Sequence, residues 1–282
     1  MSLNEKAMLV HLNISFWTAR KYDRKISREI EIQYNADEAG RYNKILIANE
    51  YLANIRKMVS AARTFHYENT LPWNDNGGRL LPAANYFNYV KAMQNLQADF
   101  DRETANFIRV YPDLKNEAKL RLNGMFDEED YPDISTLRTK YAFSSQVTPV
   151  PEAEDFRVKL NDSEVDSIKQ SIERQVQNST REAMNDLWNR LFRVVNHMAE
   201  RLADPDNKFK NSLVDNIVDL CDLLPRLNIT SDPKLEDALL EVRQKLTAND
   251  SQILRDNDVV RTKTAAEAQK ILDKMKHYLP AA

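Results

Sequence analysis

The chain has 282 residues, of which 42% are apolar and 29% charged, and its formal net charge is −3. This apolar content is enough for a sizeable core and excludes a disordered chain, while the presence of only four glycines favours long helices over sheets with tight turns. The charge shows no strong basic bias of the kind typical of nucleic-acid-binding domains.

The N-terminal part predicts one strand followed by helices. Residues 8–14 alternate apolar and polar side chains, which is typical of a short strand. Apolar residues at steps of three and four then predict long helices over residues 16–35 (capped by Ser15), 37–65 and 82–111. Pro112 is expected to interrupt the third, and Gly124 to end the shorter helix that follows.

An acidic joint follows, because residues 127–155 carry 2 basic and 8 acidic side chains. Its segment 139–148 is β-prone and is expected to pair with the strand at 8–14. This joint predicts three consecutive segments: residues 1–126 (an N-terminal helical hairpin domain), 127–155 (the joint) and 156–282 (a C-terminal helical domain).

The C-terminal part carries helix signals throughout. An apolar stripe runs for about forty residues from Ser163, with the polar stretch QNSTREAMND as its weak point. Further helices are predicted over residues 211–224, over 233–246 with Asp232 as cap, and from a capping box that begins at Thr264. The expected fold class is therefore mainly α: an elongated bundle of long, coiled-coil-like helices with a small β element.

The single cysteine and the absence of a long apolar run bear on location. Cys221 lies on an apolar helical stripe, where a buried thiol is the ordinary outcome. No run of about eighteen apolar residues exists, and the N-terminus lacks the order of a secretory signal. A cytoplasmic protein without membrane segments is expected.

Residues 65–87, FHYENTLPWNDNGGRLLPAANYF, concentrate unusual residue types and allow two interpretations. In the first, His66 is the centre of an acid–base site together with Glu68, Asp75 and Arg79. In the second, His66, Trp73, Gly77 and Gly78 belong to a structural loop that plugs the end of a helix hairpin. No nucleophile and base stand at a recognisable spacing, so the sequence favours the structural loop.

Two stretches are candidate contact surfaces. In WTARKYDRKISR, basic residues recur every four positions and predict a basic ridge on a helix; the residues concerned are Arg20, Lys21, Arg24, Lys25 and Arg28, flanked by Trp17 and Tyr22. A solvated face balanced by nearby acids is the alternative interpretation. The second candidate is an apolar stripe that suits either an oligomer interface or burial within the chain: Trp188, Leu191, Phe192 and Val195.

No metal or cofactor is predicted from the motifs. The four histidines lie far apart in sequence without partners at ligand spacing. The GG pair at residues 77–78 is not followed by the lysine and hydroxyl residue of a phosphate-binding loop.

The stretches LNISFWTARKYDRK, GRYNKILIA, ARTFHYENTLPWNDNGGRLLPAANYF and FSSQVTPVPEAEDFRVKL resemble an uncharacterised family of proteins encoded by tailed bacteriophages. The resemblance runs from Met1 to about Asn228. Related proteins are sometimes encoded near MoxR-like AAA+ ATPases and von Willebrand A-type proteins, so the resemblance implies an adaptor in the host cytoplasm whose protein partner is an AAA+ ATPase or a host complex.

The sequence thus leads to two functional hypotheses. The first is a non-enzymatic phage protein that acts through protein–protein assembly as an adaptor, scaffold or modulator, with a homo-oligomer as one arrangement. The alternative is a nucleic-acid-associated protein of phage DNA metabolism, with the basic ridge on phosphates and Trp17 or Tyr22 stacked on bases.

Overall fold

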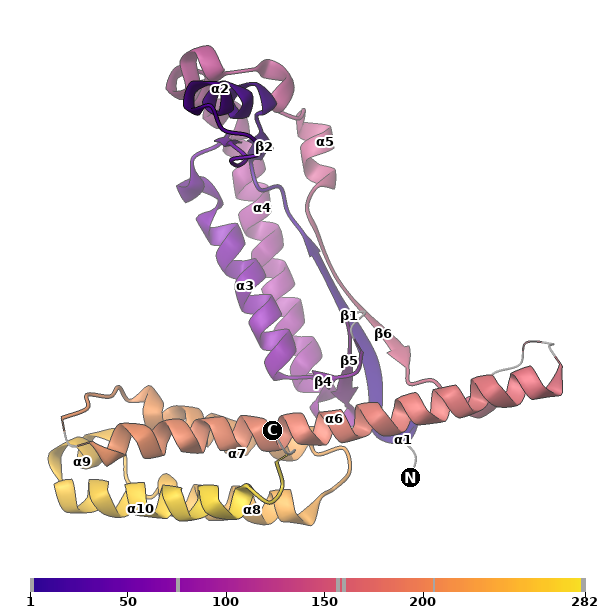
Figure 1. Cartoon of the computed structure of the whole chain (residues 1–282), viewed down its shortest axis with the longest axis vertical. Helices are drawn as coiled ribbons and strands as arrows, with labels where there is room; N and C mark the ends of the chain where they lie inside the picture. Colours follow the sequence, from indigo (N-terminus) through magenta and orange to yellow (C-terminus); the bar gives the residue numbers. More distant parts are fainter. Residues whose placement is uncertain (1–2, 75–76, 156–157, 159–160, 205, 280–282) are drawn as a thin grey trace. The chain divides into compact units, whose positions relative to one another are not determined.

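The computed structural model describes residues 3–74, 77–155, 158, 161–204 and 206–279. Long helices and a small antiparallel sheet make up these residues (Figure 1), which confirms the expected mainly α class with a small β element. Contacts within the chain define two compact units, here called unit 1 (residues 1–11, 67–89 and 146–282) and unit 2 (residues 12–66 and 90–145). Each unit combines separate stretches of sequence, whereas the prediction from sequence was three consecutive segments.

The helices that lie wholly within unit 1 come mostly from the C-terminal half. They are α1 (Leu3–Lys6), α6 (Asp162–Ala203), α7 (Ser212–Leu227), α8 (Pro233–Leu246), α9 (Ser251–Asp256) and α10 (Asp258–Met275). Helices α6 and α10 pack together, as do α7 and α8, around a core of leucines and valines that includes Leu187, Val195 and Leu224. Cys221 is buried in this core as expected.

Local signals placed some helix ends correctly and others wrongly. The Asp232 carboxylate accepts a hydrogen bond from the Lys234 N–H at 3.0 Å, which confirms it as the cap of α8. The capping box at Thr264 is wrong, because α10 begins six residues earlier, where the Asn257 side chain accepts from two backbone N–H groups. The Thr264 hydroxyl instead donates to the Val260 carbonyl within the helix.

Helix α6 continues through the polar stretch that was expected to be its weak point. Ser179 and Ala183 in that stretch are buried. The Ser179 hydroxyl donates to the Trp73 carbonyl at 2.8 Å. Small side chains here leave room for a neighbouring backbone, so the stretch is a packing site.

The sheet has the strand order β4 (Leu71–Pro72), β5 (Gly78–Pro82), β1 (Ala7–Ser15) and β6 (Ala142–Pro149). The predicted pairing of residues 8–14 with 139–148 is confirmed, since β6 lies beside β1. Strands β4 and β5 were not predicted; they pair antiparallel within the stretch expected to be a loop, with Leu71 opposite Leu80.

Unit 2 contains β2 (Arg20–Tyr22), α2 (Arg24–Tyr34), β3 (Asn43–Ile45), α5 (Ile134–Thr139) and most of α3 (Ala53–Glu68) and α4 (Tyr86–Leu122). Helices α3 and α4 lie side by side (Figure 1), and the Asn54 amide donates to Glu103 across them at 3.0 Å. Aromatic rings form much of the core, with Phe100 and Phe107 both in contact with Tyr141.

Three expectations about the helices of unit 2 are wrong. The helix expected over 37–65 begins only at Ala53, because residues 43–45 pair as β3 with β2. Pro112 does not interrupt α4, which continues to Leu122; tertiary packing therefore outweighs the local cost of proline, about 3 kcal/mol. The left-handed residue after α4 is Asn123, with φ 47°, rather than Gly124.

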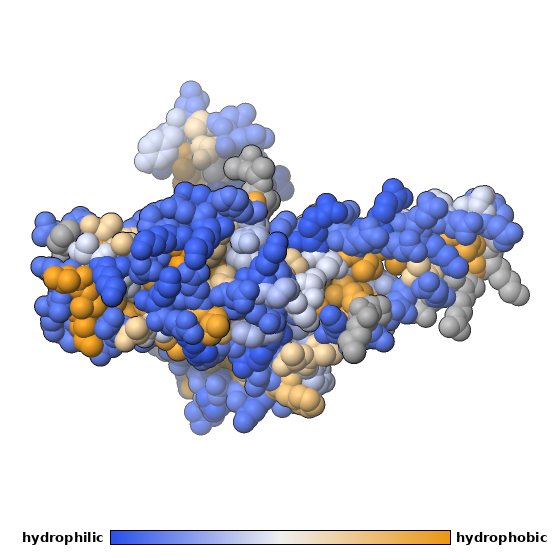
Figure 2. Space-filling view, turned by 90° about the horizontal axis from the view of Figure 1, so that it is seen from below, coloured by the Kyte–Doolittle hydropathy of each residue, from blue (hydrophilic) through white to orange (hydrophobic). Residues whose placement is uncertain are grey.

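Within the described part of the chain, no helix is long and apolar enough to cross a membrane. Figure 2 shows one face of the molecule, on which hydrophilic residues predominate and hydrophobic residues occur in small groups.

Candidate functional site

The predicted basic ridge does not form on a single helix. Arg20 and Lys21 lie in strand β2, which pairs with β3, and α2 begins only at Arg24. Asp23 caps α2 by accepting from the Ile26 N–H at 3.1 Å. This aspartate is a preferred N-cap residue and was the signal, missed in the sequence, that separates the two halves of the ridge.

Residues 16–19, also predicted as helix, are held in an irregular conformation by distant contacts. The Trp17 ring packs against Phe107 and Tyr111, with centroid distances of 6.3 and 5.7 Å. The Ala19 backbone is left-handed at φ 52°, and its carbonyl accepts the Leu46 N–H at 2.8 Å. Trp17 therefore belongs to the aromatic core, whereas Tyr22 remains exposed beside the Arg41 guanidinium.

Lys21 is committed to an internal charge cluster that also contains Lys44 and Asp130. The Asp130 carboxylate, with a side chain only 2% exposed, lies 2.5 Å from Lys21 Nζ and 2.6 Å from Lys44 Nζ. Lys44 is also buried, donates to the Met125 carbonyl at 2.9 Å and lies 3.5 Å from Asp23. Two lysines thus converge on one buried carboxylate.

The electrostatics of this cluster favour its charged form. Burial by itself raises the pKa of Asp130, but the hydrogen bonds and charges of Lys21 and Lys44 outweigh it and hold the pKa below its ordinary value. Burial lowers the pKa of Lys44, yet contact with Asp130 raises it overall. The hydrogen bond to Asp130 also raises the pKa of Lys21. The cluster is therefore an ion-paired support of the fold, and Lys21 is not a free contact residue.

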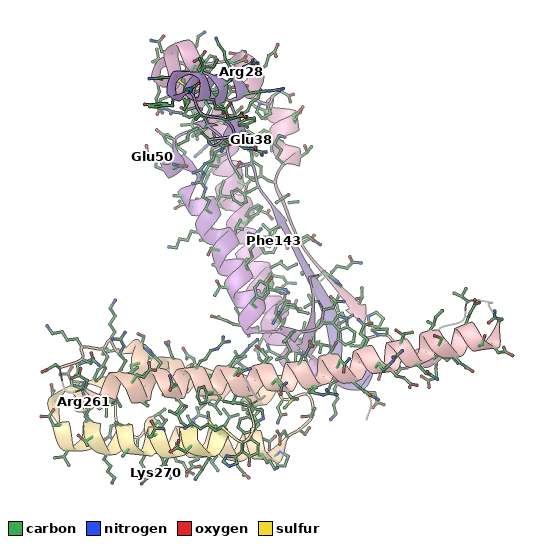
Figure 3. All side chains as sticks on the ribbon, in the orientation of Figure 1. Arg28, Glu38, Glu50, Phe143, Arg261 and Lys270 are labelled. Atoms are coloured by element: carbon green, nitrogen blue, oxygen red, sulfur yellow. The ribbon has the colours of Figure 1, made fainter. Side chains whose placement is uncertain are left out.

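The remaining ridge residues form an exposed surface on α2. Arg24, Arg28 and Ile32 follow one another at four-residue steps, and Lys25 adjoins them, so these side chains share one face of the helix. Ser27 is the residue of α2 that is buried, while Ile32 is 71% exposed. Arg28 is labelled on α2 in Figure 3. We call Arg24, Lys25, Arg28 and Ile32 the α2 face.

The α2 face carries uncommitted positive charge. Within the described part of the chain, Arg24, Lys25 and Arg28 make no ion pair. Glu29 and Glu31 remain on the same helix, but Asp23 is occupied as its cap. Ile32 lies one helical turn after Arg28 and two turns after Arg24, and adds an exposed apolar side chain to this face.

The apolar stripe of α6 is placed inside unit 1. Trp188, Leu191 and Val195 are buried, and Phe192 is half-buried. The Trp188 ring stacks on Tyr278 with centroids 4.6 Å apart. Burial within the chain, one of the two interpretations of this stripe, accounts for these side chains.

The residues of the 65–87 stretch separate into different environments. His66 and Trp73 are buried, with exposed fractions of 3% and 4%. Gly77 has φ +79°, a backbone conformation that favours glycine. At Gly78 a Cβ atom would lie 2.9 Å from His11 Nε2, so the approach of β5 to β1 requires a small residue there. Asp75, part of the catalytic interpretation, lies outside the described residues.

A cleft beside this stretch is lined by arginines and carboxylates in equal number. The cleft has a volume of about 660 Å³ and is lined by Glu68, Arg79 and Arg190 among others. Arg79 Nε donates to the Thr70 hydroxyl at 2.7 Å. Burial lowers the pKa of the Arg79 guanidinium, and the positive charge of Arg190 lowers it further. Arg190 donates to the carbonyls of Tyr67 and Thr70 and pairs with Asp186. Both guanidinium groups are thus bonded to backbone at the end of α3, a structural use of their charge.

Among the described residues, no group of three or more His, Cys, Asp or Glu side chains is placed to hold a metal ion. Comparisons with protein-family models, with curated proteins and with solved structures found no match to this chain.

Proposed function

We propose that this chain is a non-enzymatic protein that acts through protein–protein assembly, with the α2 face as its docking surface. The observation that carries the proposal is Ile32, an aliphatic side chain 71% exposed to solvent one helical turn after Arg28, on a helix that also exposes Tyr34 (71%) and Ile30 (39%). The partner is a protein segment that presents apolar and acidic side chains together.

The chemistry of the face argues for a protein rather than a nucleic acid. Carboxylates on the partner complement Arg24, Lys25 and Arg28, and an apolar partner side chain covers Ile32. Burying an isoleucine side chain contributes about 1.5 to 3 kcal/mol. A phosphate backbone satisfies the cations but leaves Ile32 in water.

The resemblance to tailed-phage proteins gives this proposal its biological form. In that form the chain is a phage-encoded adaptor or modulator. The partner class that the resemblance implies is an AAA+ ATPase or another host complex. Self-association into a homo-oligomer is a second way of covering the same face.

The test is affinity capture from infected cells, compared between the natural chain and two matched variants. Ile32→Ser removes the aliphatic side chain of the α2 face, while Leu120→Ser removes a leucine that is even more exposed, at 84%, from α4 in the same unit. We expect Ile32→Ser to reduce recovery of one specific protein at least fivefold, and Leu120→Ser to leave it unchanged, by quantitative mass spectrometry. The recovered partner is then expected to bind the purified chain through an acidic segment. Equal recovery with both variants would contradict the proposal.

Nucleic-acid binding is the second candidate, because the three cations of the face are free of ion pairs within the described chain. It predicts the opposite sensitivity: Arg24→Gln with Arg28→Gln weakens DNA binding and flattens its salt dependence, whereas Ile32→Ser leaves both unchanged. Fluorescence anisotropy with single- and double-stranded DNA measures this. Absence of measurable binding removes the candidate.

A further inference from the structure

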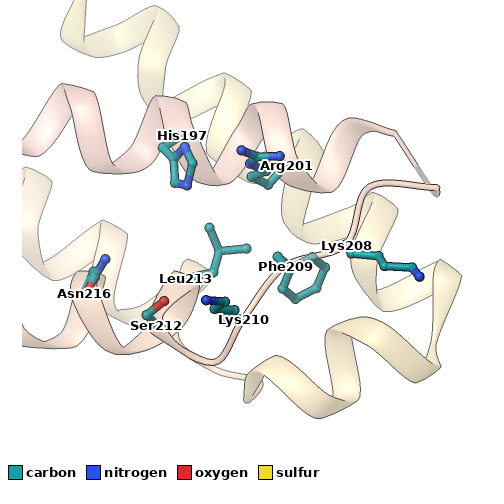
Figure 4. Close-up of a pocket in the computed structure, with 8 residues that line it drawn as sticks. All are labelled: His197, Arg201, Lys208, Phe209, Lys210, Ser212, Leu213 and Asn216. Carbon is teal, nitrogen blue, oxygen red and sulfur yellow. The ribbon is translucent and has the colours of Figure 1, made fainter.

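A small basic pocket lies in unit 1 where α6 is connected to α7 (Figure 4). Its volume is about 260 Å³. His197 and Arg201 come from the last turns of α6, Lys208 and Lys210 from the connection, and Ser212 and Asn216 from the first turns of α7. In Figure 4 His197 and Arg201 face Lys210, Ser212 and Asn216 across a shared space, while the Lys208 side chain extends away from them.

The charge in this pocket is of one sign. No carboxylate is among its lining residues in the described chain, and Arg201, Lys208 and Lys210 form no ion pair there. The acids near these residues in sequence are exposed and do not line the pocket: Glu200, Asp204, Asp206 and Asp215. His197 supplies an N–H donor in either protonation state, and Ser212 and Asn216 add a hydroxyl and an amide.

Two arginines hold the connection between the helices in place. Arg261 is buried and donates to the backbone carbonyls of Arg201 and Asn207, at 3.1 and 3.0 Å, and to that of Asp204. Arg255 donates to the Phe209 carbonyl at 3.2 Å. The backbone that carries the lysines is thereby ordered before any ligand arrives, which lowers the entropic cost of binding.

The start of α7 adds to the positive potential. Asn211, the residue at its N-cap position, makes no side-chain capping bond, and its amide oxygen accepts from Arg255 at 2.8 Å. The side chain of Asn211 therefore does not cap α7, and the Leu213 and Val214 N–H groups donate instead to the carbonyls of Lys210 and Asn211. The positive end of the helix dipole then acts in the same direction as the three cations Arg201, Lys208 and Lys210.

We propose that this pocket binds a phosphate group, either as inorganic phosphate or as the end of a small phosphomonoester. Arginine and lysine donors together with a hydroxyl and an amide suit the several oxygens of a phosphate. The volume of about 260 Å³ lies below the roughly 300–1,000 Å³ of clefts that enclose drug-sized ligands. It therefore suits one anionic group rather than a whole nucleotide. The pocket is separate from the α2 face and does not depend on the function proposed for that face.

The test is isothermal titration calorimetry of the full chain with inorganic phosphate, at ionic strength held constant with sodium chloride. The double variant Arg201→Gln, Lys210→Gln removes two donors from the pocket. Arg181→Gln removes an exposed arginine of the same helix, about 30 Å away along its axis. We expect the double variant to raise the dissociation constant for phosphate about tenfold or more and Arg181→Gln to leave it unchanged. Because Arg201, Lys210 and Arg181 are exposed, all variants are expected to keep the natural circular dichroism spectrum.

A second titration with glycerol 3-phosphate separates the two sources of the anion. Tighter binding of inorganic phosphate assigns the free ion, and tighter binding of glycerol 3-phosphate assigns a monoester. The proposal is overturned if neither compound binds, if the double variant binds them as tightly as the natural chain, or if only DNA binds and is unaffected by the double variant.

Discussion

At the scale of single residues, Asp130 shows how one buried carboxylate organises distant parts of unit 2. Its partners Lys21 and Lys44 lie in the paired strands β2 and β3. The contact of Lys21 with Asp130 joins residues 109 positions apart in the chain. Removing one partner of such a group leaves uncompensated buried charge, which costs more than the intact pair contributes.

Asp130→Asn is expected to lower the free energy of unfolding by about 3 kcal/mol, because Lys44 stays buried and keeps only the more distant Asp23 as a counter-charge. Chemical denaturation at neutral pH measures this loss. Glu129→Gln, an exposed neighbour, is the control and is expected to change stability by less than about 0.5 kcal/mol. Equal losses in the two variants would show that the cluster does not support the fold.

The same cluster predicts a pH dependence with a definite sign. Folding lowers the pKa of Asp130, so its contribution is fully present above the unfolded value of about 3.9 and is lost as pH falls through the lower folded value. Folding raises the pKa of Lys44, so that contribution is present below about 10.4 and is lost as pH rises through the higher folded value. The unfolding free energy of Asp130→Asn is therefore expected to fall less steeply than that of the natural chain as acid is added below about pH 4.

At the scale of elements, α6 has two parts with different support. In residues 162–178 none of the side chains is buried, whereas buried residues recur from Ser179 to Leu202. Isolated helices are marginal in water, and most helical stability in proteins comes from packing. Continuity of the helix therefore does not imply uniform stability along it.

The hydrogen-exchange rates of the α6 amides are expected to change sharply near Ser179. Amides of residues 166–178 should exchange at least about a hundredfold faster than those of residues 187–202, since local opening there breaks few buried contacts. Mass spectrometry of overlapping peptides measures the difference. Uniform protection along the helix would mean that the first part is covered in solution, for example by a second copy of the chain.

At the scale of the whole molecule, the chain passes four times between the two units, after residues 11, 66, 89 and 145. The core of unit 1 accordingly includes residues from outside the C-terminal half, such as Leu71, Trp73 and Leu80. A cut at a single point in the sequence therefore cannot separate the units.

A fragment of residues 156–282, the C-terminal segment predicted from sequence, is expected not to fold as it does in the full chain. It lacks Leu71, Trp73 and Leu80, and losing three buried side chains at about 1.5 to 3 kcal/mol each removes much of a typical stability of about 5 to 15 kcal/mol. We expect a broad thermal transition and poorly dispersed amide signals by NMR, beside the full chain as reference. A cooperative transition at the temperature of the full chain would establish residues 156–282 as an independent domain.

The sequence by itself determined the features that depend on residues a few positions apart. The three- and four-residue steps along α6, the Asp232 cap of α8 and the alternation of residues 8–14 all appear in the structure. Each of these signals is complete within one element, so it could be predicted without knowing what the element packs against.

Tertiary structure alone decided that the basic ridge is divided between two elements, that β4 and β5 form, and that a basic pocket lies between α6 and α7. Arg20 and Arg28 have helical spacing, but pairing of β2 with β3 and packing of Trp17 place them in different elements. The physical reason is one of magnitude: helix propensities differ by tenths of a kcal/mol per residue, whereas burying an aromatic ring or pairing a buried carboxylate involves several. Contacts between distant residues therefore overrode local preference wherever the two disagreed.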